Sequence, residues 1–359
     1  NVFQLQNESF VIPYNGTILE VNDRVSECTS ELVDLIETPI EGKETKIVFV
    51  SAPTGAGKTY TFINEVSKLR RERKPNERAA MVVPTIALAE QIGETYNVPV
   101  VRGGSDNADI MAAATAPFFV ATYDSAPKVG GVDFLIVDEA HHLTRNFREK
   151  ATQGVLDLMQ LSRKVVLMSG TPVSGWKEFD AGLIEIKVKN VAPVNVLVHE
   201  IGKRASIQDQ AFKVAENASQ TDGLTVIRLN RKTEMKAIEK HLIDTGVFQS
   251  FEIATLTSDD KDSPVFDSIV KSSIIPANVR VLITTSLLDD GVNINNVNID
   301  GVHFFQDKIG GRVSTEESIQ FISRFRNWRK SFHIYFNEDD RTSDNPLNAT
   351  QHLKGRKSH

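Results

Sequence analysis

Hydrophobic residues fall in two series of short runs, each alternating with stretches of helical spacing. In the first series, runs rich in β-branched and aromatic residues cover residues 46–50, 80–83, 118–122, 133–137 and 164–168. Strand-like runs that alternate with helix-length segments are typical of βαβ units, whose strands lie parallel in one sheet. The first half of the chain is therefore predicted to be α/β, with a parallel sheet flanked by helices.

The same rhythm starts again after residue 185, which predicts a second parallel sheet. This second series covers residues 194–198, 224–228, 251–256, 279–284, 302–305 and 332–336. Gly175, Gly182 and Pro193 lie between the two series and indicate a hinge region. The expected division is an N-terminal extension at 1–40, a first domain at 41–185, a second domain at 186–340 and a polar tail at 341–359.

The composition agrees with two globular domains. With 359 residues, the chain is too long for one ordinary domain, and each half is long enough to bury its own core. Hydrophobic residues make up 40% and charged residues 25%, which excludes collagen-like, disordered and membrane-embedded classes. No run approaches the roughly 20 apolar residues that span a bilayer, and no signal peptide is evident, so we expect an intracellular location in the cytoplasm or nucleus. Cys28 is the single cysteine, which excludes an internal disulfide or a thiolate metal site.

A glycine-bearing loop follows the first strand-like run and precedes a helix. This order suits a phosphate-binding loop, because glycines let backbone N–H groups face phosphate oxygens and a helix N-terminus attracts anions. Lys58 is expected to reach the β- and γ-phosphates, and the Thr59 hydroxyl to hold magnesium. Ala52 stands where the usual pattern has its first glycine, and a turn without a ligand is the alternative. The candidate nucleotide-binding residues are Ala52, Pro53, Thr54, Gly55, Ala56, Gly57, Lys58 and Thr59.

Two carboxylates end the apolar run at 133–137. A buried strand that ends in Asp138 and Glu139 is unfavourable unless the acids meet a cation. Asp138 is the candidate for magnesium coordination, and Glu139 for orienting and deprotonating an attacking water. His141 is expected either to relay between sites or to be an ordinary polar residue at a strand end, and His142 to be structural.

These motifs resemble the ordered motifs of superfamily 2 helicases. The resemblance is carried by the segments SAPTGAGKT (51–59), DEAH (138–141), SGTP (169–172) and QFISRFR (320–326), and it extends from about residue 46 to 330. It implies two tandem RecA-like P-loop NTPase domains that hydrolyse ATP with Mg²⁺ in a cleft between them. The charged and polar residues of the motifs would then act together to move the protein along a nucleic-acid strand.

In the first domain, the resemblance assigns nucleic-acid backbone contacts to Pro84, Thr85, Arg102, Gly103 and Thr122. A threonine hydroxyl and free amides at a helix start are suitable ligands for a phosphate. A helix N-cap is the alternative for Thr85, and a solvated surface charge is the alternative for Arg102.

The segment at 169–171 resembles the element that couples hydrolysis to domain movement. It comprises Ser169, Gly170 and Thr171, for which an ordinary turn before Pro172 is the alternative.

In the second domain, the resemblance assigns backbone contacts to Asn230, Arg231, Thr284 and Thr285, and places Asp290 and Gly291 near the nucleotide.

Gln320, Arg324 and Arg326 resemble the family's arginine-finger segment, whose arginines stabilise charge on the γ-phosphoryl group. Ser323 and Asn327 depart from the common Q-x-x-G-R-x-G-R form, so either arginine is a candidate for the finger. The alternative is a helix that is simply basic.

The implied function is an ATP-dependent helicase or translocase that grips DNA or RNA without reading its sequence. The net charge of −6 restricts any nucleic-acid site to a local groove, and no membrane partner is expected. An aromatic-then-glutamine element for reading adenine is not recognisable before Lys46, so the preference for ATP is implied by the family only. Alternatives are a duplex translocase, the motor module of a larger primase, nuclease or defence assembly, and, less favoured, a protein-translocating ATPase.

Overall fold

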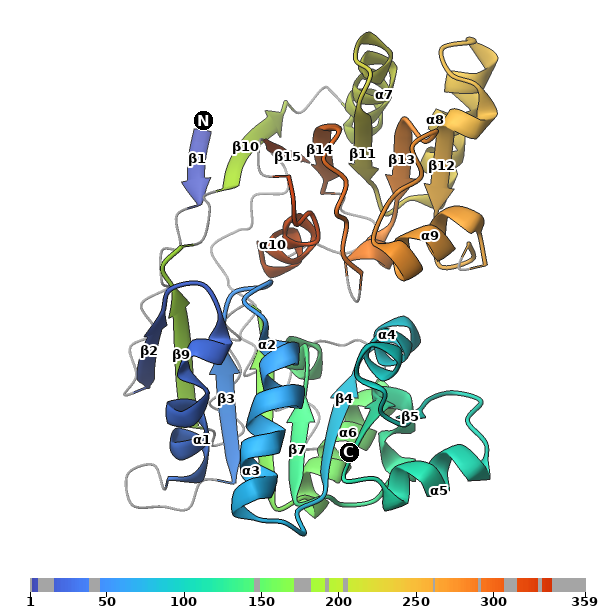
Figure 1. Cartoon of the computed structure of the whole chain (residues 1–359). Helices are drawn as coiled ribbons and strands as arrows, with labels where there is room; N and C mark the ends of the chain where they lie inside the picture. The colour runs from blue at the N-terminus through green and yellow to red at the C-terminus, as the bar shows by residue number, and fades with distance from the viewer. Residues whose placement is uncertain are drawn as a thin grey trace, which may run out of the picture. The chain divides into compact units, whose positions relative to one another are not determined.

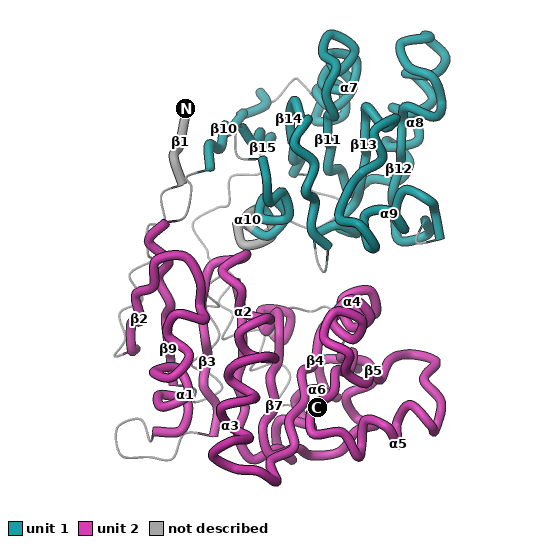
Figure 2. Tube along the Cα trace, in the orientation of Figure 1, with its two compact units in different colours: residues 1–9, 192–346 teal, residues 10–191, 347–359 magenta. Residues whose placement is uncertain are grey.

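The computed structural model describes residues 2–5, 16–38, 46–144, 149–170, 182–190, 194–202, 206–260, 262–289, 292–306, 315–328 and 331–337. The chain divides into two compact units, shown in Figure 2. Unit 1 comprises Asn1–Ser9 and Ala192–Pro346, and unit 2 comprises Phe10–Val191 and Leu347–His359.

Unit 2 is built on an eight-stranded sheet in the order β2-β9-β3-β8-β7-β4-β6-β5, in which all paired strands are parallel (Figure 1). Its strands are β2 (Thr17–Val21), β3 (Ile47–Ser51), β4 (Ala79–Val83), β5 (Val100–Val101), β6 (Phe118–Thr122), β7 (Phe134–Val137), β8 (Lys164–Ser169) and β9 (Gly182–Val188). Because the strands are parallel, the carboxyl ends of β3, β7 and β8 meet at one edge of the sheet, where the predicted nucleotide-binding residues lie.

Helices cover both faces of this sheet, so its central strands are buried on both sides. One face packs against α1 (Thr29–Glu37), α4 (Ile86–Tyr96) and the continuous helix formed by α2 (Lys58–Tyr60), η2 (Thr61–Val66) and α3 (Ser67–Arg73). The other face packs against α5 (Asn107–Thr115), η3 (Tyr123–Lys128) and α6 (Glu149–Leu161). Within β4, Met81 faces the first core and Val82 the second, as alternation along a strand requires.

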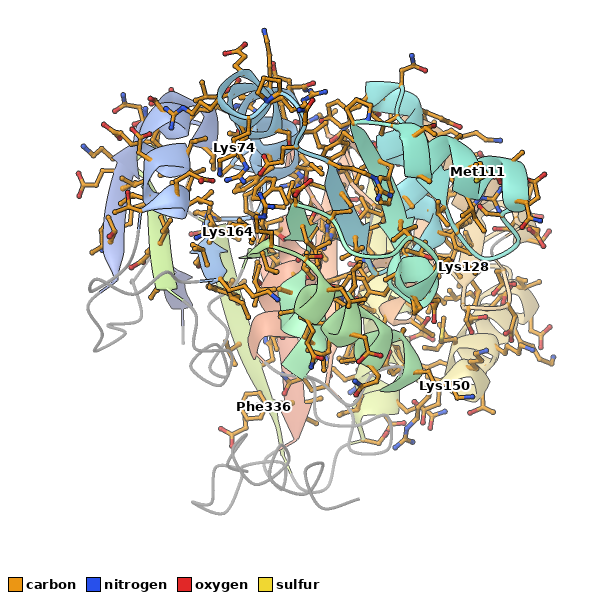
Figure 3. The ribbon with its side chains drawn as sticks, turned by 90° about the horizontal axis from the view of Figure 1, so that it is seen from below. Lys74, Met111, Lys128, Lys150, Lys164 and Phe336 are labelled. Atoms are coloured by element: carbon orange, nitrogen blue, oxygen red, sulfur yellow. The ribbon has the colours of Figure 1, made fainter. Side chains whose placement is uncertain are left out.

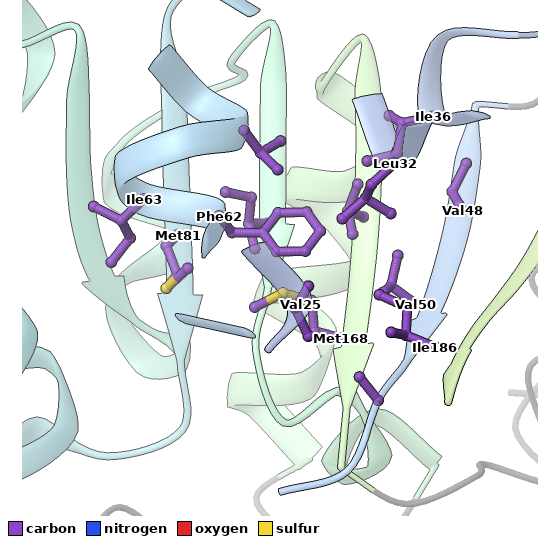
Figure 4. Packing of buried hydrophobic residues seen from close by; sticks show 14 of the residues in the cluster. Val25, Leu32, Ile36, Val48, Val50, Phe62, Ile63, Met81, Met168 and Ile186 are labelled. Carbon is purple, nitrogen blue, oxygen red and sulfur yellow. The ribbon is translucent and has the colours of Figure 1, made fainter. Parts of the chain in front are cut away.

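Residues 17–37, expected to belong to an extension, contribute β2, the 3-10 helix η1 (Val25–Cys28) and α1 to unit 2. Val25, Leu32 and Ile36 are fully buried and share a core with Phe62 and Met168 (Figure 4). Residues 182–188, where Gly182 was expected to lie in a hinge, form β9 between β2 and β3, so the chain leaves unit 2 only after Val191. Gly175 and Pro193 lie outside the described residues.

Unit 1 has a seven-stranded sheet in the order β1-β10-β15-β14-β11-β13-β12. Its strands are β1 (Val2–Leu5), β10 (Val194–Ile201), β11 (Leu224–Arg228), β12 (Ile253–Leu256), β13 (Val281–Thr284), β14 (Ile299–Phe305) and β15 (Phe332–Asn337). β1 pairs antiparallel with β10, which the rhythm of the sequence did not predict, and the other pairs are parallel.

The helices of unit 1 also cover both faces of its sheet. One core includes residues of α9 (Pro264–Ser272) and α10 (Thr315–Ser323), and the other includes residues of α7 (Ile207–Asn217) and α8 (Lys232–Asp244). Both units are therefore three-layer α/β domains of the predicted class.

Charged side chains lie mainly at the surface. Lys74, Lys128 and Lys150 are exposed on unit 2, and Figure 3 shows their side chains from below. No helix in the described part of the chain is long and apolar enough to cross a membrane.

Candidate functional site

The phosphate-binding loop (residues 52–59) connects β3 to the helix that begins at Lys58. Gly55 (φ 87°) and Gly57 (φ 84°) have left-handed backbone conformations, which side chains with a Cβ rarely adopt. The Lys58 ammonium is buried and donates hydrogen bonds to the carbonyl oxygens of Ala52 at 2.7 Å and Pro53 at 3.2 Å. The loop thus brings a lysine, turned backbone amides and a helix start to one place, which is an arrangement suited to phosphate.

Asp138 follows β7 and lies beside this loop. The Thr59 hydroxyl donates a hydrogen bond to Asp138 Oδ2 at 3.2 Å, so two motifs separated by 79 positions meet. The pKa of Asp138 is raised to about 6, chiefly by burial and then by the Glu139 carboxylate, while Lys58 opposes the shift. A bound cation would favour the charged carboxylate, and a hydroxyl with a carboxylate supplies the oxygen ligands that Mg²⁺ prefers. The two residues therefore fit a magnesium ion.

No group of three or more His, Cys, Asp or Glu side chains among the described residues is arranged to hold a metal. A magnesium ion that is bound together with a nucleotide does not need such a group, because Mg²⁺ is commonly held by one or two carboxylates together with substrate phosphates and water.

Glu139 has a φ of 50°, a left-handed conformation that is uncommon outside glycine. Its backbone N–H donates to Asp138 Oδ1 at 2.9 Å, and the Tyr123 hydroxyl donates to the Asp138 carbonyl at 2.6 Å, so both bonds hold this turn in place. Residues in such conformations are concentrated at functional sites. The Glu139 side chain is 13% exposed, which leaves its carboxylate accessible for proton transfer.

His141 and Ser169 connect the carboxylates to the end of β8. His141 Nδ1 lies 3.4 Å from both Ser169 Oγ and Glu139 Oε2, and both His141 and Ser169 are buried. His142 is also buried, with its ring centroid 4.2 Å from that of His141. Both contacts are made by the same ring nitrogen, so His141 lies between Glu139 and the end of β8, and its role as a relay stays a prediction.

The predicted coupling element lies directly beside the phosphate-binding loop. Ser51 pairs with Ser169 in the sheet, and the Ala52 N–H donates to the Ser169 carbonyl at 3.3 Å. A Cβ added to Gly170 would lie 2.1 Å from Thr54 Oγ1, so a larger residue at this position would require the Thr54 side chain to move. Thr171 lies outside the described residues.

Three of the predicted nucleic-acid contacts of unit 2 lie close together. Thr85 is the N-cap of α4 and accepts a hydrogen bond from the Leu88 N–H at 3.2 Å. Arg102 is 43% exposed and forms an ion pair at 2.8 Å with Glu90 of the same helix, and Gly103, next to it, is exposed. These residues remain candidates for a phosphate contact.

Pro84 and Thr122 are placed differently from the other predicted contacts of unit 2. Both are buried, and Thr122 is only 1% exposed. A backbone contact by either side chain therefore needs a rearrangement of its surroundings.

In unit 1, Asn230 and the segment after β13 lie together. Asn230 Oδ1 accepts a hydrogen bond from the Ser286 N–H at 3.2 Å, and Thr285 caps the 3-10 helix η8 (Ser286–Leu288). Thr284 is fully buried and donates its hydroxyl proton to the Thr285 carbonyl at 3.2 Å. Arg231, the N-cap residue of α8, pairs with Glu234 at 2.6 Å. Asn230, Arg231 and Thr285 are partly exposed, whereas Thr284 is not accessible.

The two arginine-finger candidates have different surroundings. Arg324 is 5% exposed, donates from Nε to the Asp289 carbonyl at 2.7 Å and from Nη2 to Gln320 Oε1 at 3.3 Å. Arg326 is partly exposed and donates from Nε to Asn293 Oδ1 at 2.8 Å. Asp290 and Gly291, predicted near the nucleotide, lie outside the described residues.

Three residues that shape these sites were not predicted from the sequence. Tyr123 supports the turn of Asp138 and Glu139, and Arg228 forms a buried ion pair with Asp289. The sequence feature that could have indicated this ion pair is a charged residue, Arg228, at the end of the otherwise apolar run at 224–228. The partner could not be identified, because residues 228 and 289 are linked only by tertiary structure.

Comparison with known proteins shows which family model and which solved structures the chain is similar to. Residues 34–179 match the DEAD/DEAH box helicase family model. No curated protein matches the chain. Among solved structures, Mss116p bound to ssRNA and AMP-PNP is 16% identical with a TM-score of 0.60, and the match covers 96% of this chain and 81% of that one.

Two further solved structures have the same fold. Dbp5 of S. cerevisiae bound to RNA and ADP BeF3 is 16% identical, with a TM-score of 0.62 over 93% of this chain and 86% of that one. The Escherichia coli DEAH/RHA helicase HrpB is 18% identical, with a TM-score of 0.56 over 87% of this chain and 42% of that one. Residues 34–179 thus match the DEAD/DEAH box helicase family model, and the chain as a whole has the fold of two RecA-like α/β domains that these solved helicase structures share.

Proposed function

We propose that this protein is a nucleic-acid-dependent ATPase that uses ATP hydrolysis to move along or unwind DNA or RNA. The observation that carries the proposal is the meeting of Lys58, Thr59, Asp138 and Glu139 at one edge of the unit 2 sheet. Structures of similar fold support the choice of ligands. Mss116p is bound to ssRNA and AMP-PNP, and the DUF1998 helicase MrfA, which is 13% identical with a TM-score of 0.63, is bound to DNA and AMPPNP.

The residues of unit 2 have distinct roles in this proposal. Lys58 exchanges its bonds to the Ala52 and Pro53 carbonyls for bonds to the β- and γ-phosphates, while the loop amides hold the remaining oxygens. Thr59 and Asp138 would hold Mg²⁺, which would neutralise charge on the phosphates when bound. Glu139 orients a water molecule and accepts its proton as the water attacks the γ-phosphorus, while the bond from the γ-phosphorus to the bridging oxygen breaks and ADP leaves.

In unit 1, Arg324 and Arg326 are the candidates that stabilise the charge developing on the γ-phosphoryl group. A residue in this role typically contributes about 10³–10⁵ in turnover. His141, Ser169 and Gly170 link the state of the phosphate site to the rest of unit 2, because they contact both the carboxylates and the phosphate-binding loop.

We further propose that the nucleic acid is held through its phosphates. The accessible candidates are hydroxyls, amides and arginines, which are suited to phosphates rather than to base edges. Binding should therefore weaken strongly with added salt and depend little on base sequence.

The test is the rate of ATP hydrolysis alone and with single-stranded RNA, single-stranded DNA, duplex or an unfolded polypeptide. Stimulation by either single strand supports the proposal, and stimulation only by duplex favours a duplex translocase. Stimulation by polypeptide and by no nucleic acid contradicts the proposal and favours a protein-translocating ATPase. A strand-displacement assay on RNA and DNA substrates with opposite overhangs then separates unwinding from translocation and reports polarity.

A further inference from the structure

Unit 1 contains a buried ion pair at the end of β11. Arg228 is 1% exposed, and its guanidinium donates from Nε to Asp289 Oδ1 at 3.3 Å and from Nη2 to Asp289 Oδ2 at 2.6 Å. The guanidinium carbon also lies 4.4 Å from the centre of the Phe304 ring, so the side chain is fixed from two directions. The geometry is the two-point fork that makes arginine a directional partner for a carboxylate.

The same aspartate holds Arg324 through its main chain. The Asp289 carbonyl accepts a hydrogen bond from Arg324 Nε at 2.7 Å, while its carboxylate is occupied by Arg228. Asp289 therefore joins the end of β11 to the arginine-finger segment after α10. A second hydrogen bond holds the main chain of Arg324, since the Ile294 N–H donates to the Arg324 carbonyl at 2.7 Å.

This ion pair is a poor means of stabilising the fold. Removing two charges from water is expensive, and hydrophobic residues of similar volume are often as stabilising as a buried pair or more so. In addition, Arg228 Nη1 is buried and makes no hydrogen bond within the described part of the chain. What the pair supplies is direction, because a hydrophobic contact would not fix the position of the Asp289 carbonyl in the same way.

We propose that the Arg228–Asp289 pair is a positioning device that holds the Arg324 guanidinium in the orientation required for ATP hydrolysis. The inference rests on the proposed function, and specifically on Arg324 acting on the nucleotide. Arg228 and Asp289 are positioning residues, since they act through Arg324.

The test replaces the pair with apolar residues of similar size, Arg228→Met with Asp289→Leu. The matched control is Arg70→Met with Glu77→Leu in unit 2, because Arg70 is also buried, bonds a buried glutamate and lies over an aromatic ring, that of Phe134. None of these control residues is a predicted site residue. Each protein is assayed for kcat, KM for ATP and urea unfolding.

We expect the Arg228/Asp289 double variant to fold and to lose kcat by about tenfold to a hundredfold, as a displacement of about 1 Å in a reacting group does. KM for ATP should change less than about twofold, because this variant leaves the phosphate-binding loop intact. The control variant should keep its kcat. In an Arg324→Ala background, replacing the pair should reduce kcat no further, since the residue through which it acts is absent.

Two outcomes overturn the inference while leaving the proposed function intact. One is a normal kcat in the folded double variant when Arg324→Ala alone is slow. The other is a combined variant in which the fold-loss of kcat equals the product of the fold-losses caused by replacing the pair and by Arg324→Ala. If Arg324→Ala itself hydrolyses ATP normally, the role of Arg324 in the proposed function fails first. Should the double variant not fold, Arg228→Lys decides the question, because it keeps the charge but loses the two-point fork, and an unchanged kcat would refute the proposal.

Discussion

Lowering the pH from about 7 to about 5 should destabilise unit 1 through a buried histidine, His303, because its imidazole must stay neutral in the fold. His303 lies on β14, with Nδ1 3.1 Å from the Tyr335 hydroxyl and its ring centroid 4.6 Å from that of His333. His333 in turn bonds His199 at 2.9 Å. Burial, and secondarily the proximity of His333 and His199, lowers the pKa of His303 from 6.5 to about 3. Burial also lowers the pKa values of His333 and His199.

The direction of this change in stability with pH follows from proton linkage. The pKa is lower in the folded state than in the unfolded state, so the unfolded chain binds more protons as the pH falls below 6.5. The stability due to a neutral His303 is therefore complete above pH 6.5 and is lost progressively towards the folded pKa near 3. Between about pH 7 and about pH 5 the loss from this residue is about 2 kcal/mol of unfolding free energy.

The measurement is urea unfolding of unit 1, followed by the fluorescence of Trp328, which is 2% exposed. Trp176→Phe removes the second of the two tryptophans, so the signal reports unit 1 alone. Since carboxylates also contribute to acid destabilisation, the decisive quantity is the difference between this background and the same protein with His303→Gln. The glutamine variant should lose about 2 kcal/mol less on acidification. An equal loss in both proteins would show that His303 does not titrate as its surroundings require.

Two further predictions concern ATP hydrolysis. Lys58→Ala should abolish turnover because it removes the phosphate ligand, whereas Glu139→Gln should retain nucleotide binding and stall hydrolysis; equal loss of fluorescent-nucleotide binding in both would contradict the assigned roles. Arg324→Ala and Arg326→Ala should differ in kcat, because Arg324 is buried and Arg326 is partly exposed; if neither slows steady-state hydrolysis by at least about tenfold, the arginine-finger assignment is wrong.

Much of the fold was predictable because the central strands are buried on both faces and appear as continuous apolar runs. The predicted runs at 118–122 and 224–228 coincide with β6 and β11. β9 was missed because it begins with a glycine and carries Glu185 and Lys187, which are only partly buried, at alternate positions. The first two residues of the run at 251–256 form a 3-10 turn instead of a strand, since Glu252 and Gln249 cap each other.

The convergence of the motifs was equally predictable, for a geometric reason. Residues at the carboxyl ends of neighbouring parallel strands meet, so Thr59, Asp138 and Ser169 had to lie near one another once the sheet was inferred. The burial of Thr122 and Thr284 was not predictable in this way, because spacing along the chain does not reveal which hydroxyl faces solvent. The roles of all these residues stay predictions until the variants are measured.

The N-terminal segment of unit 2 determines where the smallest self-sufficient fragment that contains the phosphate-binding loop can begin. The Val25 N–H donates to the Ala56 carbonyl at 2.9 Å, and Glu27 accepts bonds from the amides of Asn22, Asp23 and Arg24, so this segment braces the phosphate-binding loop from outside its motif. A fragment cut at Lys46, where the recognisable motifs start, would uncover the apolar surface now covered by Leu32 and Ile36 and would leave the loop without this brace.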